Sequence, residues 1–213
     1  MKPSAKLFFS TFWNAFLPQN IVLVQAMGLC PILAIGYTLP YGVALSACTT
    51  AVLVPVGLIF DWWGAAISPK LRPVLYVLSS SVLLLGAALI LRQCISPEIY
   101  ASLYLFLPLM AVNTLFTYRA AGTGFGRRNP LLSLADSLGS ALGFSLVLCV
   151  TAALREMAIN GTLWGIALGY EIRFPEAKNP FIGYVLLGFM AAALQWMKQL
   201  FRPRAEKKGA IEP

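Results

Sequence analysis

The sequence predicts an all-α membrane protein with six transmembrane helices, and three observations support this class. First, 59% of the 213 residues are hydrophobic and only 11% are charged, whereas a soluble domain carries about 25% charged residues. Second, the mean hydropathy is +0.76. Third, six apolar runs each approach the length of about 20 residues that a helix needs to cross the hydrocarbon layer. A chain of this composition has lipid as its main solvent.

The six predicted spans are joined by connections that are mostly short and rich in turn-forming residues. Only residues 155–180 form a connection long enough to hold structure outside the membrane core. We therefore expect a single membrane domain over residues 1–213. The spans cover residues 20–38, 42–60, 73–92, 99–118, 132–154 and 181–201.

The distribution of lysine and arginine predicts the orientation. With the N-terminus inside, twelve of the 16 basic residues fall on the inner side and four on the outer side. Cytoplasmic segments carry this excess in membrane proteins, so both termini are expected in the cytoplasm. The basic residues lie at the ends of apolar runs, without a basic stripe interleaved with aromatic residues. The net charge of +8 therefore indicates contact with the bilayer surface and argues against nucleic acid as a partner.

Three spans precede residue 98 and three follow it, so the two halves would enter the membrane from opposite sides. Halves of this kind form inverted repeats, in which broken helices from each half meet near the middle of the membrane. We predict a first repeat over about 1–97 and a second over about 98–213, with the first and fourth spans broken.

The first span contains "GLCPILAIG", in which Gly28, Cys30 and Pro31 lie close together. Pro31 removes a backbone donor and clashes with the backbone one turn earlier, so a helix break is expected here. A thiol at such a break can act as a thiolate, a ligand suited to iron–sulfur clusters. Alternatively, Cys30 is a small apolar residue beside an ordinary proline kink.

The fourth span offers a counterpart in "LPLMAVNTLFTYRA". Pro108 is expected to break the helix, and Asn113 and Thr114 are polar groups close to the membrane interior. In an inverted repeat they would face the break of the first span and line a shared site. Alternatively, they make the interhelical or local backbone hydrogen bonds that are common in membrane bundles.

The fifth span carries the one acidic residue within a predicted span, Asp136. It is either a functional group inside the membrane or a carboxylate that favours the N-terminal turn of its helix. Gly139 and Gly143 are four residues apart and should let a neighbouring helix approach closely. At the far end of this span, Arg155 and Glu156 are expected to pair with each other.

Two further features exclude some classes of chemistry. The chain has no histidine, which excludes His-ligated metal sites and the catalytic arrangements that use Ser-His-Asp or Cys-His. The four cysteines lie in or beside apolar segments, which is a poor setting for structural disulfides.

Four stretches together resemble the six-helix membrane subunits of the Rnf electron-transport complex and of the related sodium-pumping NADH:quinone reductase. They occur in the order and spacing of that family, and an inner N-terminus favours the RnfE/NqrD side over the inverted RnfA/NqrE side. The stretches are "NIVLVQAMGLCPILA" (20–34), "LPLMAVN" (107–113), "NPLLSLADSLGSALGFSLVL" (129–148) and "LREMAINGTLWG" (154–165).

The resemblance implies a function that the residues alone do not. It implies a translocase subunit of the bacterial inner membrane that is not catalytic alone and that pairs with an RnfA/NqrE-like partner around a binuclear iron–sulfur cluster. Flavin-bearing and NADH-oxidising subunits would complete the complex, and electron transport would be coupled to ion transport. On this pattern Cys30 is the metal ligand that the first span supplies, and Asn113 and Thr114 belong to the same cofactor-binding site.

One departure from the family pattern affects the expected ligand set. The family has a second cysteine after the asparagine of the fourth span, and this sequence has Thr114. A threonine hydroxyl is a poor substitute for a thiolate on iron. Three alternatives follow: a cluster with an altered or partner-derived ligand, a diverged paralogue that serves as a cluster-free scaffold or small transporter, or an engineered substitution.

Overall fold

The computed structural model describes residues 5–63, 67–68, 70–104, 106–111, 130–167, 169 and 174–201. Most of these residues are helical, and a two-stranded antiparallel hairpin follows the longest helix. The helices are α1 (Ala5–Phe16), α2 (Ile21–Gln25), α3 (Leu29–Ile35), α4 (Leu39–Trp63), α5 (Arg72–Cys94), α6 (Pro97–Tyr104), α7 (Leu107–Ala111), α9 (Pro130–Asn160) and α10 (Pro180–Phe201); the short elements are β1 (Thr162–Leu163), β2 (Ile166–Ala167) and the 3-10 helix η2 (Pro175–Lys178).

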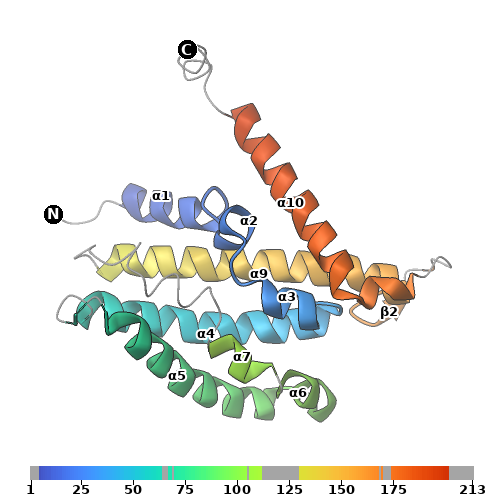
Figure 1. Cartoon of the computed structure of the whole chain (residues 1–213), viewed down its shortest axis with the longest axis horizontal. Coiled ribbons are helices and arrows are strands. Elements are labelled where there is room, and N and C mark those ends of the chain that lie inside the picture. The colour runs from blue at the N-terminus through green and yellow to red at the C-terminus, as the bar shows by residue number, and fades with distance from the viewer. Residues whose placement is uncertain are drawn as a thin grey trace.

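The centre of the molecule is the antiparallel pair α4 and α9, which lie side by side along much of their length (Figure 1). α5 packs on the side of α4 that faces away from α9, and α1 runs along the opposite side of α9. The facing surfaces of the central pair supply much of the core, with Leu45, Val52 and Val56 from α4 and Phe144 and Leu148 from α9 all buried. The central pair is therefore the scaffold on which the shorter helices are placed.

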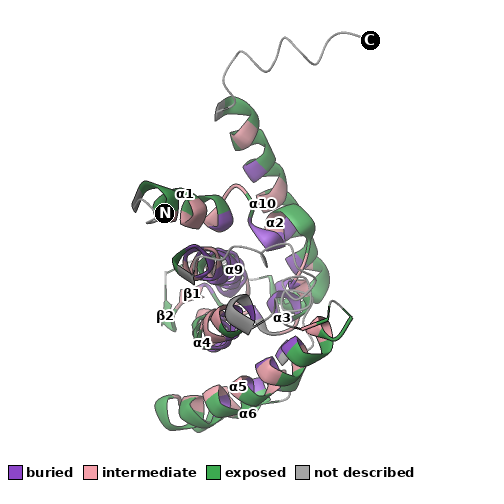
Figure 2. Ribbon diagram, turned by 90° about the vertical axis from the view of Figure 1, so that its left-hand side faces the viewer, coloured by how far each residue is buried: buried purple, intermediate pink, exposed green. Residues whose placement is uncertain are grey.

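α10 leaves this scaffold and leans away from the other helices (Figure 1). Most of its surface is exposed, as Figure 2 shows, although its exposed side chains include Phe189 and Trp196. The outward face of α5 is also apolar and includes the exposed Val82 and Leu85. Helices that are apolar all round belong in a membrane or a protein interior. These faces are suited to contact with lipid or with another membrane protein.

Four helices are long and apolar enough to cross a membrane within the described part of the chain: Leu39–Phe60, Arg72–Cys94, Leu131–Asn160 and Pro180–Leu200. They correspond to the second, third, fifth and sixth predicted spans. The other two predicted spans contain only short helices in the described residues. The arrangement of six spans in two inverted repeats therefore remains a prediction.

The two short-helix regions lie where broken spans were predicted. The first predicted span is divided into α2 and α3. In the fourth, α6 ends at Tyr104 and α7 starts at Leu107, so the interruption precedes Pro108. Pro108 lies in the first turn of α7, where its missing N–H is not needed, and its ring would clash with the carbonyl of Tyr104 if α6 and α7 formed one helix. The interruption between α6 and α7 therefore agrees with the predicted break at Pro108. Residues 112–129 of this region lie outside the described residues.

α1 has no counterpart among the predicted spans, because its 12 residues are too few to cross a bilayer. It packs against α9 at the two glycines of the fifth span. A Cβ atom added at Gly139 would lie 2.6 Å from the carbonyl oxygen of Phe12, and one at Gly143 would lie 2.7 Å from that of Phe16. The prediction that these glycines admit a close neighbouring helix is confirmed, and the neighbour is α1.

Candidate functional site at the broken first span

The break in the first predicted span is built from two residues with left-handed backbone conformations. Ala26, with φ 54°, ends α2, and Gly28, with φ 80°, is the N-cap of α3. Pro31 lies in the first turn of α3 and is buried. Its ring would clash with the carbonyl of the residue four positions earlier, Met27, if the helix were continuous. The predicted break is therefore confirmed, and it lies where the proline requires it.

Cys30 is the second residue of α3 and is exposed at this break. The other three cysteines are elsewhere: Cys48 is buried on α4, Cys149 is half-buried on α9, and Cys94 is exposed at the end of α5. All four are free thiols. Asn113 and Thr114, the predicted partners of Cys30, lie outside the described residues. The structure thus leaves Cys30 accessible to a group on another chain.

Asn20 fixes the start of the broken span. Its side-chain oxygen accepts hydrogen bonds from the amides of Val22 (3.0 Å) and Leu23 (3.3 Å), which caps α2. Its side-chain nitrogen donates to the carbonyls of Phe16 (3.1 Å) and Gly143 (3.0 Å). This buried side chain therefore joins α1, α2 and α9 at one point.

Arg155 fixes the end of the broken span. Arg155 belongs to α9, and its side chain is fully buried. One terminal nitrogen, Nη1, donates to three carbonyl oxygens at the end of α3, those of Ile32 at 3.4 Å, Leu33 at 3.1 Å and Gly36 at 3.2 Å. The last carbonyls of a helix carry partial negative charge, so a cation here is favourable.

The same guanidinium also binds the segment that leads into α10. Nε donates to the carbonyl of Ala177 at 3.0 Å, and Nη2 donates to those of Lys178 at 2.8 Å and Asn179 at 3.4 Å. A guanidinium has five N–H donors in a planar fork, which permits bonding in two directions at once. Arg155 therefore connects α3, α9 and the start of α10.

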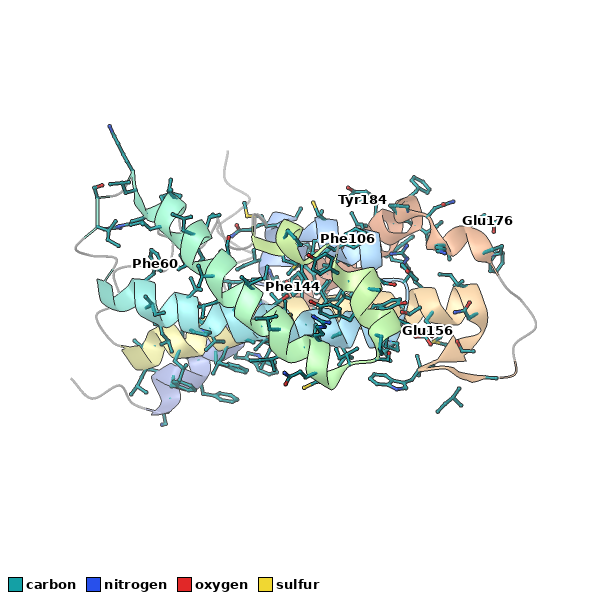
Figure 3. All side chains as sticks on the ribbon, turned by 90° about the horizontal axis from the view of Figure 1, so that it is seen from below. Phe60, Phe106, Phe144, Glu156, Glu176 and Tyr184 are labelled. Atoms are coloured by element: carbon teal, nitrogen blue, oxygen red, sulfur yellow. The ribbon has the colours of Figure 1, made fainter. Side chains whose placement is uncertain are left out.

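Glu156 organises a second set of backbone groups at this end of the molecule. One carboxylate oxygen accepts from the amide of Leu39 at 2.6 Å, at the start of α4. The other accepts from the hydroxyl of Thr162 at 3.3 Å and the amide of Gly165 at 3.1 Å, both in the hairpin. Figure 3 shows Glu156 at the end of the molecule that also holds Glu176 and Tyr184, with Phe60 at the other.

These contacts explain the stretch "LREMAINGTLWG" as one structural unit. Gly161, with φ 64°, ends α9, and its amide donates to the carbonyl of Met157 at 3.0 Å. Trp164 and Gly165 both have positive φ and form the two-residue hairpin turn, as a type I′ turn requires. The turn returns the chain to the carboxylate of Glu156.

The predicted pairing of Arg155 with Glu156 is wrong. Both side chains are buried, and the hydrogen bonds described above take the arginine to carbonyls and the glutamate to donors. Consecutive helical residues point in different directions and do not face each other. Each charge is instead balanced by oriented backbone groups, which form hydrogen bonds worth about 1.5–3 kcal/mol each when one partner is ionised.

Asp136 lies in the second turn of α9 and is half-buried. It is far from Arg155, because 19 residues of α9 separate the two. At a rise of about 1.5 Å per residue this separation exceeds 25 Å. Asp136 therefore does not belong to the end of α9 that Arg155 forms.

The donor set determines how far this chain fits an iron–sulfur cluster. Cys30 fits, since it is a soft thiol at a helix break and is accessible from outside the chain. No group of three or more Cys, Asp or Glu side chains that could hold a metal ion occurs among the described residues. A cluster needs four ligands, so this part of the chain suits a shared site and not a complete one.

The helical fold and the comparison with known families together show that this is a helical membrane protein. The chain belongs to the Rnf-Nqr family, because the model of that family, described as "Rnf-Nqr subunit, membrane protein", matches residues 8–201.

Three individual relatives agree with this assignment over 79% to 97% of this chain. The E-type subunit of the ion-translocating oxidoreductase complex of Azotobacter vinelandii (strain DJ / ATCC BAA-1303) is 32% identical and covers 97% of this chain and 91% of its own length. Its counterpart of the same name from Thioalkalivibrio sulfidiphilus (strain HL-EbGR7) is 36% identical over 79% of this chain and 72% of its own. The E-type subunit of the proton-translocating ferredoxin:NAD(+) oxidoreductase complex of Clostridium ljungdahlii is 26% identical over 94% and 98%.

Proposed function

We propose that this chain is the E-type membrane subunit of an ion-translocating electron-transport complex in the bacterial inner membrane. In this role it helps to hold an intramembrane binuclear iron–sulfur cluster with an RnfA/NqrE-like partner. The names of the relatives support the membership of a complex. The observation that carries the cluster proposal is the exposed Cys30 at the break of a span whose start is fixed by Asn20 and whose end is fixed by Arg155.

In this role the chain supplies a ligand to the shared cluster. Cys30 would contribute one thiolate to the shared site, and the residues after α7, with Asn113 and Thr114, would line it. Such a cluster, when bound, supplies one-electron transfer. The protein's own contribution is to fix the thiol in place and to exclude water with the surrounding apolar helices. The flavin-bearing and NADH-oxidising subunits would lie on either side of this transfer step.

The experiment measures iron and acid-labile sulfide in the purified complex, with EPR spectra after reduction. Cys30→Ser should remove the signal of the binuclear cluster. Cys94→Ser is the matched control, because Cys94 is equally an exposed free thiol but lies at the end of α5. Its iron content should equal that of the unmodified complex. Retention of the binuclear signal in Cys30→Ser would disprove the assignment.

A second candidate function follows from Thr114, which stands where the family pattern has a cysteine. In that case the chain is a cluster-free scaffold or small transporter built on the same fold. Thr114→Cys separates the two. If the native complex already holds the cluster, this variant leaves the iron content unchanged. If iron and sulfide appear only in the variant, the native chain is the scaffold.

A further inference from the structure

We infer that Arg155 is a positioning residue for the Cys30 thiol: its guanidinium holds the end of α3 against α9 and α10 and thereby sets where the other end of α3 presents Cys30. The inference rests on the proposed function of Cys30 as a ligand. It adds to that function a residue that is far away in sequence and lies on a different helix.

α3 is a short helix. It has seven residues, which at about 1.5 Å per residue makes it roughly 10 Å long. Cys30 lies near one end and the carbonyl of Leu33, which accepts from Arg155, is one turn away. Helices this short are not stable in isolation. The place of α3, and with it the place of Cys30, must come from contacts with the rest of the molecule.

The two ends of α3 differ in structure. At its start, the chain passes through two residues with positive φ, Ala26 and Gly28, in an interruption between helices. At its end, three carbonyls bind one buried guanidinium. The last turn of α3 is thus bonded directly to a buried side chain of α9. A change in the anchor is transmitted along a single turn to the thiol.

The end of α3 also has contacts with the region around Arg155. Arg155 is fully buried, and its other donors are bound to Ala177, Lys178 and Asn179 before α10. Close packing adds to these bonds, since a Cβ atom at Gly183 of α10 would lie 2.7 Å from the side chain of Leu33. Lys178 also lies over the ring of Tyr37, 5.5 Å from its centre. The end of α3 is therefore held from α9 and α10 together.

Substitution of Arg155 by lysine and by methionine should affect the position of Cys30 to different degrees. Lysine keeps the charge but has a single ammonium, which cannot bond in two separate directions as a guanidinium does. Methionine keeps an unbranched apolar stem and removes all the donors. The position of Cys30 should become less well defined in Arg155→Lys, and still less in Arg155→Met.

The test measures distances between spin labels by double electron–electron resonance on the full chain in lipid nanodiscs. Cys30 and Cys94 are the two exposed native thiols, and Cys48→Ala with Cys149→Ala leaves them as the labelling sites. The control pair joins Cys94 to Leu146→Cys, an exposed position on α9, in a chain that carries Cys30→Ala. This pair reports the packing of the scaffold without α3.

With Arg155→Met, the distance distribution of the Cys30 pair should become at least twofold broader, while that of the control pair stays unchanged. Arg155→Lys should give an intermediate width and provides the same comparison if the methionine variant does not fold. An unchanged Cys30 pair in both variants would overturn the inference. Equal broadening of both pairs would also overturn it, because Arg155 would then stabilise the whole bundle.

The distance measurement needs no iron, so its result is separate from that of the iron analysis. If Arg155→Met displaces Cys30 but Cys30→Ser leaves the cluster intact, the role of Arg155 is supported and the role of Cys30 as a ligand is disproved. If Cys30→Ser removes the cluster but Arg155→Met leaves Cys30 in place, the role of Cys30 is supported and that of Arg155 is disproved.

Discussion

At Gly143 the backbone of α9 meets the backbone of α1 with no space for a side chain. A methyl group there would lie 2.7 Å from the carbonyl oxygen of Phe16 and 2.9 Å from the amide nitrogen of the Asn20 side chain. Neither neighbour moves freely, because Asn20 is held by four hydrogen bonds. The close packing of α1 against α9 at this position therefore requires a residue without a Cβ atom.

We expect Gly143→Ala to destabilise the protein by about 1–3 kcal/mol, the usual cost of overpacking. The measurement is the midpoint of thermal unfolding in detergent. Gly188→Ala is the control, since a Cβ atom at this position on α10 meets nothing within 4 Å. It should keep or raise the midpoint, because alanine is the better helix former. A midpoint for Gly143→Ala equal to that of the control would contradict the packing described here.

Glu156→Gln should also lower the unfolding midpoint. Both carboxylate oxygens accept hydrogen bonds from donors, and an amide would turn an NH2 group towards one of them. An unsatisfied buried donor costs about 1–3 kcal/mol. Glu176→Gln is the matched control because Glu176 is exposed on η2, and it should leave the midpoint unchanged. Equal midpoints for the two variants would show that the Glu156 contacts contribute nothing.

At the scale of elements, the division of the first predicted span into α2 and α3 is the feature that matters most for the site. The two residues with positive φ in the break differ in chemistry. Ala26 has a Cβ atom that the left-handed conformation disfavours by about 1–2 kcal/mol, whereas Gly28 has none. The left-handed conformation is therefore strained at Ala26 and unstrained at Gly28.

Opposite effects are therefore expected from exchanging the two residue types. Ala26→Gly should raise the unfolding midpoint or leave it unchanged, because it relieves the left-handed strain. Gly28→Ala should lower it, because it introduces that strain at a buried position. Thermal unfolding of both variants under the same conditions is the measurement. A lower midpoint for Ala26→Gly than for Gly28→Ala would show that the geometry of the break is different.

The break could be predicted from sequence because its causes are local. Pro31 and Gly28 act on residues within one turn, and Gly139 and Gly143 show their small size directly in the sequence. The anchor could not be predicted in the same way. Arg155 bonds to carbonyls that are 119 to 123 residues earlier, and backbone acceptors have no residue type to recognise. In the sequence, Arg155 is followed directly by Glu156 at the end of an apolar run. That pattern is equally typical of two exposed residues that pair with each other.

For the whole molecule, the property with the largest consequence is its orientation in the membrane. The excess of basic residues predicts both termini in the cytoplasm, so the end of α5 with Cys94 would be outside and the start of α5 inside. This can be tested because Cys94 is exposed, and Lys70, next to the start of α5, is exposed as well.

In intact cells we expect a membrane-impermeant maleimide to label Cys94 in a chain whose other cysteines are alanine. Lys70→Cys, in a chain without the four native cysteines, should be labelled only after the membrane is made permeable. The positive-inside bias is the physical reason for this difference. Labelling of position 70 but not of Cys94 in intact cells would reverse the predicted topology.

The long separation between Arg155 and α3 also has a consequence for biosynthesis. While the first half of the chain is being made, the guanidinium and the carbonyls before α10 that complete the anchor do not yet exist. A seven-residue helix has little stability of its own, so α3 acquires its final place only after the ribosome has passed residue 179. The thiol site therefore reaches its final form late in biosynthesis, and a truncated chain that ends before α9 would be inserted without it.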